Sequence, residues 1–311
     1  MKTVAFARRA FGASLAAGVL AGCSASPSQP QMVPAVLAGA HARSWMLPEA
    51  SSETLLYYSD GGGNVYALSY PQGKLVGTLT GFDGSQGVCS DANGDVFITT
   101  LYTEDIFEYA HGGTEPIAKL GDYGYYPLGC AVDPVTGNLA VANTQAMNGG
   151  DGNVAIYTGA KGKPTDYTAS GLFGYSWCAY DGSGNLYVNG GNALAEMPYG
   201  SQSLDEISLS VTGDAIQWDG QYLAMINPTA KVVYRIAISG SSGTVTSTVD
   251  FTGLFAELGD DFVLPTGAIV MPFGVKQNRI TRIGQWNYPK GGTVKKTIHR
   301  VEYVEALALS I

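Results

Sequence analysis

Aspartate and asparagine recur in a set of short turns, and Asp91–Asp95 (Asp-Ala-Asn-Gly-Asp) comes nearest to a calcium-binding loop. Oxygen side chains at alternate positions open an EF-hand loop. The match ends there, because such a loop needs glycine after Asp95 and glutamate at its twelfth position, where this chain has Val96 and Tyr102. Related turns differ in length and carboxylate count: Asp60–Asn64, Asp133–Asn138 and Asp181–Asn185. The pattern predicts hairpin turns bonded to their own backbone, with no cofactor and calcium as the alternative.

The sequence gives little support for catalysis by histidine. The chain has three histidines, His41, His111 and His299, and neither His111 nor His299 lies in a context that suits catalysis. The sequence contains no Gly-x-Ser-x-Gly elbow, no His-Glu-x-x-His pair and no phosphate-binding loop. A ligand-binding or scaffolding module is therefore favoured over an enzyme.

The N-terminus carries the pattern of an export signal. Met1–Arg9 holds three basic residues, Ala10–Gly22 is apolar and small, and Cys23 follows Leu-Ala-Gly. Leu-Ala-Gly-Cys resembles the bacterial lipobox, and the resemblance implies a cleaved signal peptide (1–22), acylation of Cys23 and anchoring in a bilayer of the cell envelope. Because Ser24 follows the cysteine in place of aspartate, the outer membrane is expected in an organism that has one. Residues 23–52 are predicted to be the lipidated cysteine and a flexible Ser/Pro/Ala-rich tether.

Three further cysteines, Cys89, Cys130 and Cys178, each lie in an apolar strand just before a turn. An odd number cannot pair fully, although export places them where disulfides form. We expect small buried side chains, with a Cys130–Cys178 bridge between neighbouring repeats as the alternative. The sequence alone does not assign their redox state.

A hairpin unit recurs along residues 53–311. One form is clear at Gly87–Thr99, Gly129–Asn143 and Trp177–Asn189. A second form alternates with it, and its first apolar positions are 39 to 48 residues apart: Val65, Ile106, Val154, Leu194, Val233 and Ile280. Six copies of about forty residues, four strands each, predict an all-β, six-bladed β-propeller of antiparallel four-stranded blades.

The first blade lacks its innermost strand, because only Leu55–Ser59 precedes Val65. Val304–Ser310 at the other end of the chain offers the missing strand. We therefore expect the C-terminal strand to pair with the N-terminal blade and close the ring, which protects the sheet edges.

The repeated pattern of Gly or Trp, apolar residues, Asp-x-x-Gly-Asn and an apolar strand resembles NHL-type repeats and the six-bladed propellers of streptogramin lyases and gluconolactonase-like enzymes. The resemblance covers Glu53–Ile311 and implies the fold; it implies less about function, since propellers host many activities. The alternative function it suggests is a divalent-metal-dependent lyase or lactonase with its site in the central channel. The repeated acidic and amide ligands of such a site are not evident in the inner strands.

The loops that enter each inner strand and those that join second and third strands should share one face, which we call the rim. Its aromatic, amide and carboxylate residues suit a carbohydrate, a peptide, a small molecule or a protein partner. The formal net charge of −9 argues against nucleic acid, and we expect a monomer. The candidate binding residues are Phe82, Gln86, Tyr102, Tyr123, Tyr125, Tyr126, Asn143, Gln145, Tyr175, Trp177, Asn189, Gln217 and Asn227.

Overall fold

The computed structural model describes residues 43–252, 257–258, 261–274 and 282–311. The predicted signal peptide, Cys23, most of the tether and Ile280 lie outside these ranges. The chain divides into two compact units, Met1–Ala40 and His41–Ile311, and all of the described residues belong to the second unit. In the described part, no helix has the length and apolarity needed to cross a membrane.

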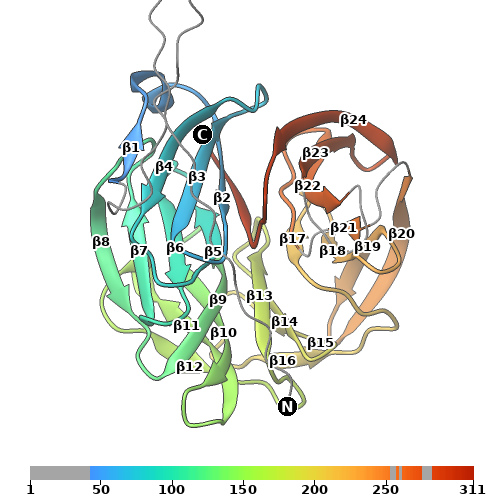
Figure 1. Cartoon of the computed structure of the whole chain (residues 1–311). Helices are drawn as coiled ribbons and strands as arrows, with labels where there is room; N and C mark the ends of the chain where they lie inside the picture. Colours follow the sequence, from blue (N-terminus) through green and yellow to red (C-terminus); the bar gives the residue numbers. More distant parts are fainter. Residues whose placement is uncertain (1–42, 253–256, 259–260, 275–281) are drawn as a thin grey trace, which may run out of the picture. The chain divides into compact units, whose positions relative to one another are not determined.

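The described chain is all-β, with strands of mostly three to eight residues and only two short 3-10 helices, η1 (Pro48–Ser51) and η2 (Thr158–Ala160) (Figure 1). Three sheets have four antiparallel strands each. In chain order their strands are β5 (Ser85–Ser90), β6 (Val96–Thr100), β7 (Asp105–Tyr109) and β8 (Pro116–Gly121); β9 (Tyr125–Val132), β10 (Leu139–Ala146), β11 (Asp151–Tyr157) and β12 (Thr165–Tyr167); β13 (Tyr175–Tyr180), β14 (Leu186–Gly190), β15 (Ala193–Met197) and β16 (Asp205–Ile207).

The sheet that holds the N-terminal strands is also closed by the C-terminus. Its five strands lie in the order β1 (Trp45–Met46), β4 (Leu75–Thr80), β3 (Asn64–Ser69), β2 (Leu55–Ser59) and β25 (Leu307–Ser310). Leu55 pairs with Ser310 and Tyr58 with Leu307, in antiparallel register. The predicted pairing of the C-terminal strand with the N-terminal strands is therefore confirmed.

The remaining strands form one eight-stranded sheet, which runs β17 (Ile216–Trp218), β18 (Leu223–Asn227), β19 (Val232–Ser239), β20 (Ser242–Thr252), β24 (Gly291–Arg300), β23 (Arg282–Asn287), β22 (Ala268–Gly274) and β21 (Glu257–Leu258). A short parallel pairing of Phe251 with Gly292 and Thr252 with Thr293 joins two antiparallel halves. The hydrogen bonding thus resolves several four-stranded sheets of a propeller-like fold without dividing them into six separate ones.

The hairpin period read from the sequence matches the strands. Val65, Ile106, Val154, Leu194 and Val233 all fall in the third strand of a sheet, in β3, β7, β11, β15 and β19. The acidic turns also form as predicted: Asp91 Oδ1 accepts hydrogen bonds from the backbone N–H groups of Asn93 and Asp95, each at 2.9 Å. Such contacts order a tight turn from within a few residues.

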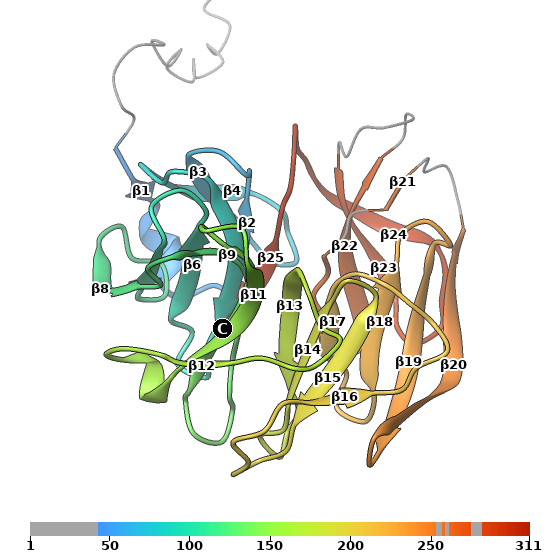
Figure 2. The ribbon, with the colours of Figure 1, turned by 90° about the horizontal axis from the view of Figure 1, so that it is seen from below.

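Inner strands of successive sheets contact one another: β25 contacts β5, β5 contacts β9, β9 contacts β13 and β13 contacts β17 (Figures 1 and 2). Glycine permits this close approach. A Cβ on Gly87 would lie 2.1 Å from the carbonyl oxygen of Leu128, and one on Gly129 would lie 2.6 Å from that of Ser176. Backbone atoms cannot move away from such a clash, so these two positions require glycine if the sheets are to pack with their inner strands together.

Candidate ligand-binding cavity

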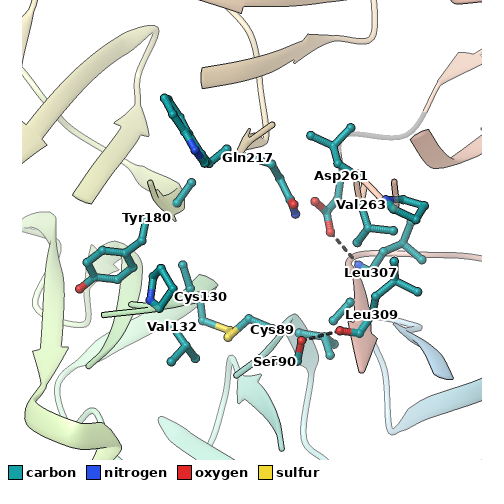
Figure 3. Close-up of a pocket in the computed structure, with 18 of the residues that line it drawn as sticks. Cys89, Ser90, Cys130, Val132, Tyr180, Gln217, Asp261, Val263, Leu307 and Leu309 are labelled. Atoms are coloured by element: carbon teal, nitrogen blue, oxygen red, sulfur yellow. Dashed lines mark hydrogen bonds between the residues drawn. A yellow bond between two sulfur atoms is a disulfide. The ribbon is translucent and has the colours of Figure 1, made fainter. Parts of the chain in front are cut away.

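A cavity of about 730 Å³ lies at the centre of the inner strands. Its lining residues come from β5, β9, β13, β17, the segment 261–266 and β25, so chain segments from both ends of the domain face the same space (Figure 3). The wall combines apolar residues, among them Val88, Val132 and Leu307, with polar ones such as Ser90 and Gln217. A concave space in which apolar surface and placed polar groups meet is the usual form of a small-molecule site.

Two polar side chains, Gln217 and Asp261, point toward the open centre of the cavity (Figure 3). Asp261 is only 3% exposed, and its carboxylate accepts hydrogen bonds from the backbone N–H groups of Phe262 and Leu307, both at 2.7 Å. These bonds fix the carboxylate beside the closing strand β25. A second carboxylate, Asp181, also lines the cavity, so the charged side chains among the described lining residues are acidic.

Trp177 lines the cavity and is half-buried. It packs against three hydrophobic clusters: one built from β2, β3, β5 and β6, one from β18, β19 and β22, and one from β14, β15 and β18. This one side chain from β13 therefore contacts residues of several sheets. Gly129 leaves room for it, because a Cβ there would lie 2.9 Å from the Trp177 ring.

The cavity mouth faces away from the rim. The lining includes residues that follow the inner strands or lie in the turn before β4, among them Pro71, Pro134, Gly182, Thr266 and Ile311. The sequence pattern predicted a ligand at the opposite ends of the strands. Of the thirteen candidate binding residues, only Trp177 and Gln217 line the cavity.

The cysteine pairing differs from the Cys130–Cys178 bridge that was the alternative expectation. Cys89 on β5 and Cys130 on β9 form the disulfide, and Cys178 is the free, buried thiol. Burial raises the pKa of Cys178 to about 12. The Cys89–Cys130 bridge joins two neighbouring sheets and is part of the cavity wall (Figure 3). Spacing could not select this pair, because all three cysteines occupy similar positions in their hairpins.

The other rim candidates divide by exposure. Tyr102, Tyr123 and Gln145 are exposed, and Tyr125, Tyr126 and Asn227 are half-buried. Phe82, Gln86, Asn143, Tyr175 and Asn189 are buried and support the fold. Phe82 packs edge-on against Phe107, and the hydroxyl of Tyr175 accepts a hydrogen bond from the backbone of Ala169.

Side chains near the ends of several second strands bond a neighbouring sheet or the loop that enters their own sheet. Asn189 donates to the carbonyl oxygen of Asp214 at 2.6 Å, and Thr99 donates to that of Leu128 at 2.7 Å. The amide of Asn227 donates to Thr212 O at 3.0 Å. Asn189 and Asn227, two of the three asparagines among the candidate binding residues, therefore tie neighbouring segments together.

A buried polar cluster between β8 and β11 was not anticipated. Asp122, Asn143 and Asn153 are each at most 2% exposed, and Asn143 donates to Asn153 Oδ1 at 2.7 Å. Three atoms of the cluster have no hydrogen-bond partner within the protein: Asp122 Oδ2, Asn143 Oδ1 and Asn153 Nδ2. Burial raises the pKa of Asp122 to about 7, although hydrogen bonding to Asn143 opposes the shift. The sequence signal that could have found the site is Asp122 directly after an outer strand.

Within the described ranges, no three His, Cys, Asp or Glu side chains gather as metal ligands. No protein-family model and no curated protein matches the sequence. The fold is similar to a solved protein of unknown function from Bacteroides caccae, with a TM-score of 0.62 and 12% identity over 83% of this chain and 99% of that one. A chain of a nidogen/laminin complex is 14% identical with a TM-score of 0.48, over 63% and 93% of the two chains. The first likeness supports a propeller-like fold.

Proposed function

We propose that this chain is a six-bladed β-propeller, anchored to the bacterial envelope through acylated Cys23, that acts as a binding module for a small ligand in its central cavity. The six-blade count is supported by the lining of the cavity, which draws on β25, β5, β9, β13, β17 and the segment 261–266 as inner strands. In this interpretation the eight-stranded sheet is two blades joined at β20 and β24. The single observation that carries the binding function is the cavity itself, which combines apolar residues with polar side chains that include Gln217 and Asp261.

The anchoring rests on the lipobox resemblance at Leu20–Cys23. Two or more acyl chains on one cysteine hold a protein on a bilayer far more firmly than one. In a bacterial host, wild-type chain should incorporate labelled palmitate and sediment with membranes, and Cys23→Ala should lose both properties. Cys178→Ala is the control, because it removes a buried thiol and keeps the lipobox. Palmitate labelling that persists in Cys23→Ala would contradict the anchor.

The chemistry of the cavity limits its ligand. Trp177 and Trp218 offer aromatic surface, the aliphatic wall favours an apolar body, and the Gln217 amide can bond a single polar group. The carboxylates of Asp181 and Asp261 line the cavity and disfavour anions. The cavity therefore fits a neutral or cationic ring compound.

Three ligands that share an indole ring and differ in charge test this function. By calorimetry, tryptamine (a cation) and indole (neutral) should bind at least about tenfold more tightly than indole-3-acetate (an anion), a difference of about 1.4 kcal/mol. Gln217→Trp, which fills the centre, should abolish this binding. Gln202→Trp adds the same ring at an exposed turn and should leave it unchanged. Tightest binding by the anion, or equal binding by Gln217→Trp, would overturn the assignment.

A further inference from the structure

Exposed apolar side chains gather on the rim, on the face opposite the cavity mouth. Tyr102, Tyr123, Met147 and Phe173 are 61%, 77%, 43% and 55% exposed. They belong to loops at the ends of β6, β8, β10 and β12, and we call them the apolar arc. Large apolar side chains that cluster on a surface mark interaction sites more often than scattered ones do.

Hydrogen bonds connect the loops that carry the arc. The backbone N–H of Asp122 donates to Glu104 O at 2.8 Å, and that of Gly124 donates to the Glu104 carboxylate. The N–H of Met147 donates to Gly124 O, also at 2.8 Å. The loops bearing Tyr102, Tyr123 and Met147 are thus tied into one surface.

Phe173 continues this surface over the next sheet. Its ring lies against Gly191, where a Cβ would be 2.6 Å from the ring, and the adjacent Gly174 lies beside the carbonyl oxygen of Thr144. The arc is therefore held by backbone contacts across neighbouring sheets. A preorganised surface of this kind loses little entropy when a partner binds.

The charge around the arc has one sign. The loops 81–84, 101–104, 122–124, 144–151, 168–174 and 190–192 contain four acids, Asp83, Glu104, Asp122 and Asp151, and no lysine, arginine or histidine. Asp122 is buried, whereas Asp83 and Asp151 are exposed at the surface. Tyrosine and phenylalanine faces attract ammonium and guanidinium groups, and carboxylates hydrogen-bond them.

We propose that the apolar arc docks an extended protein segment in which lysine or arginine alternates with apolar residues. The carboxylates select the cations, and the exposed rings and Met147 cover the apolar side chains. The overall negative charge of the domain steers such a segment toward this face and repels acidic partners. This surface is separate from the central cavity, so the two proposals can fail independently.

Fluorescence anisotropy with three labelled twelve-residue peptides tests the proposal. Repeats of Gly-Lys-Leu should bind at least tenfold more tightly than repeats of Gly-Glu-Leu or Gly-Lys-Ser, and the affinity should fall between 50 and 300 mM salt. Tyr102→Ser/Phe173→Ser should weaken binding at least tenfold. Tyr199→Ser removes an equally exposed ring from a turn outside the arc and should have no effect.

Asp83→Asn/Asp151→Asn provides a second variant that leaves the rings in place. It should weaken the Gly-Lys-Leu peptide severalfold and reduce the salt dependence. Gln217→Trp should bind this peptide as the wild type does. No binding of the Gly-Lys-Leu peptide at 50 mM salt, equal binding of the Gly-Glu-Leu peptide, or displacement by cellohexaose would overturn the proposal.

Discussion

Asp122→Asn is expected to stabilise the domain at pH 8 by about 4 kcal/mol and to change its stability little at pH 4. Burial raises the pKa of Asp122 to about 7 from an ordinary value of 3.8. Each pKa unit corresponds to 1.36 kcal/mol, so a shift of about three units gives this order of magnitude. The pKa of Asp122 is higher in the folded chain than in the unfolded chain. The protonated carboxyl group therefore contributes its full stability below about pH 4, and this contribution is lost as the pH rises through 7.

The surroundings of Asp122 offer no cation to offset its charge. Asp166 and Glu104 raise its pKa further, and only hydrogen bonds from Asn143 and Tyr157 lower it. Asparagine removes the charge and brings an amide donor into a cluster where Asn143 Oδ1 has no partner within the protein. The variant therefore removes the free-energy cost of burying an ionised carboxylate, which the wild type carries at neutral and alkaline pH.

Urea unfolding of both proteins at pH 4, 6, 7 and 8 measures the effect. The difference in unfolding free energy should grow from near zero to its full value across this range. Asp250→Asn, at an exposed carboxylate, is the matched control and should give a small difference that does not vary with pH. A difference for Asp122→Asn that is the same at every pH would show that its carboxyl group does not titrate in this window.

Cys89→Ala/Cys130→Ala should lower the unfolding free energy by about 4 kcal/mol. The two cysteines are 41 residues apart, and a cross-link over a loop of that length restricts the unfolded chain by about this amount on the chain-entropy model. The bridge joins inner strands of two sheets, so its loss also loosens the wall of the central cavity. Guanidinium unfolding with and without reductant measures the change: reductant should destabilise the wild type and leave the double variant unaffected.

Cys178→Ala separates the effect of the bridge from that of burial. It removes one buried sulfur and keeps the disulfide, so it should cost about 1 kcal/mol and retain the sensitivity to reductant. Thiol labelling of residues 43–311 should detect no reactive group in the folded state and one after unfolding. Reactive thiols at Cys89 and Cys130 in the folded, non-reduced protein would contradict the bridge, and unchanged stability of Cys89→Ala/Cys130→Ala would rule out its stabilising role.

The sequence by itself determined the local units of this protein. The acidic turns form because Asp91 and its counterparts bond backbone groups two and four residues away, which no distant segment can alter. The hairpin period located Val65, Ile106, Val154, Leu194 and Val233 in third strands, and the unpaired edge of Leu55–Ser59 indicated its partner at the C-terminus. The positions of these hairpins along the chain followed from such short-range rules.

Only the tertiary structure decided what meets at the centre and between the sheets. The packing of neighbouring sheets decides which cysteines pair, which rim candidates line the cavity and which segment Asn189 bonds. Residues that occupy equivalent places in their own hairpins meet different neighbours once those sheets pack. The physical reason is that turn geometry acts over a few residues, whereas packing around a shared axis is set by all the sheets together.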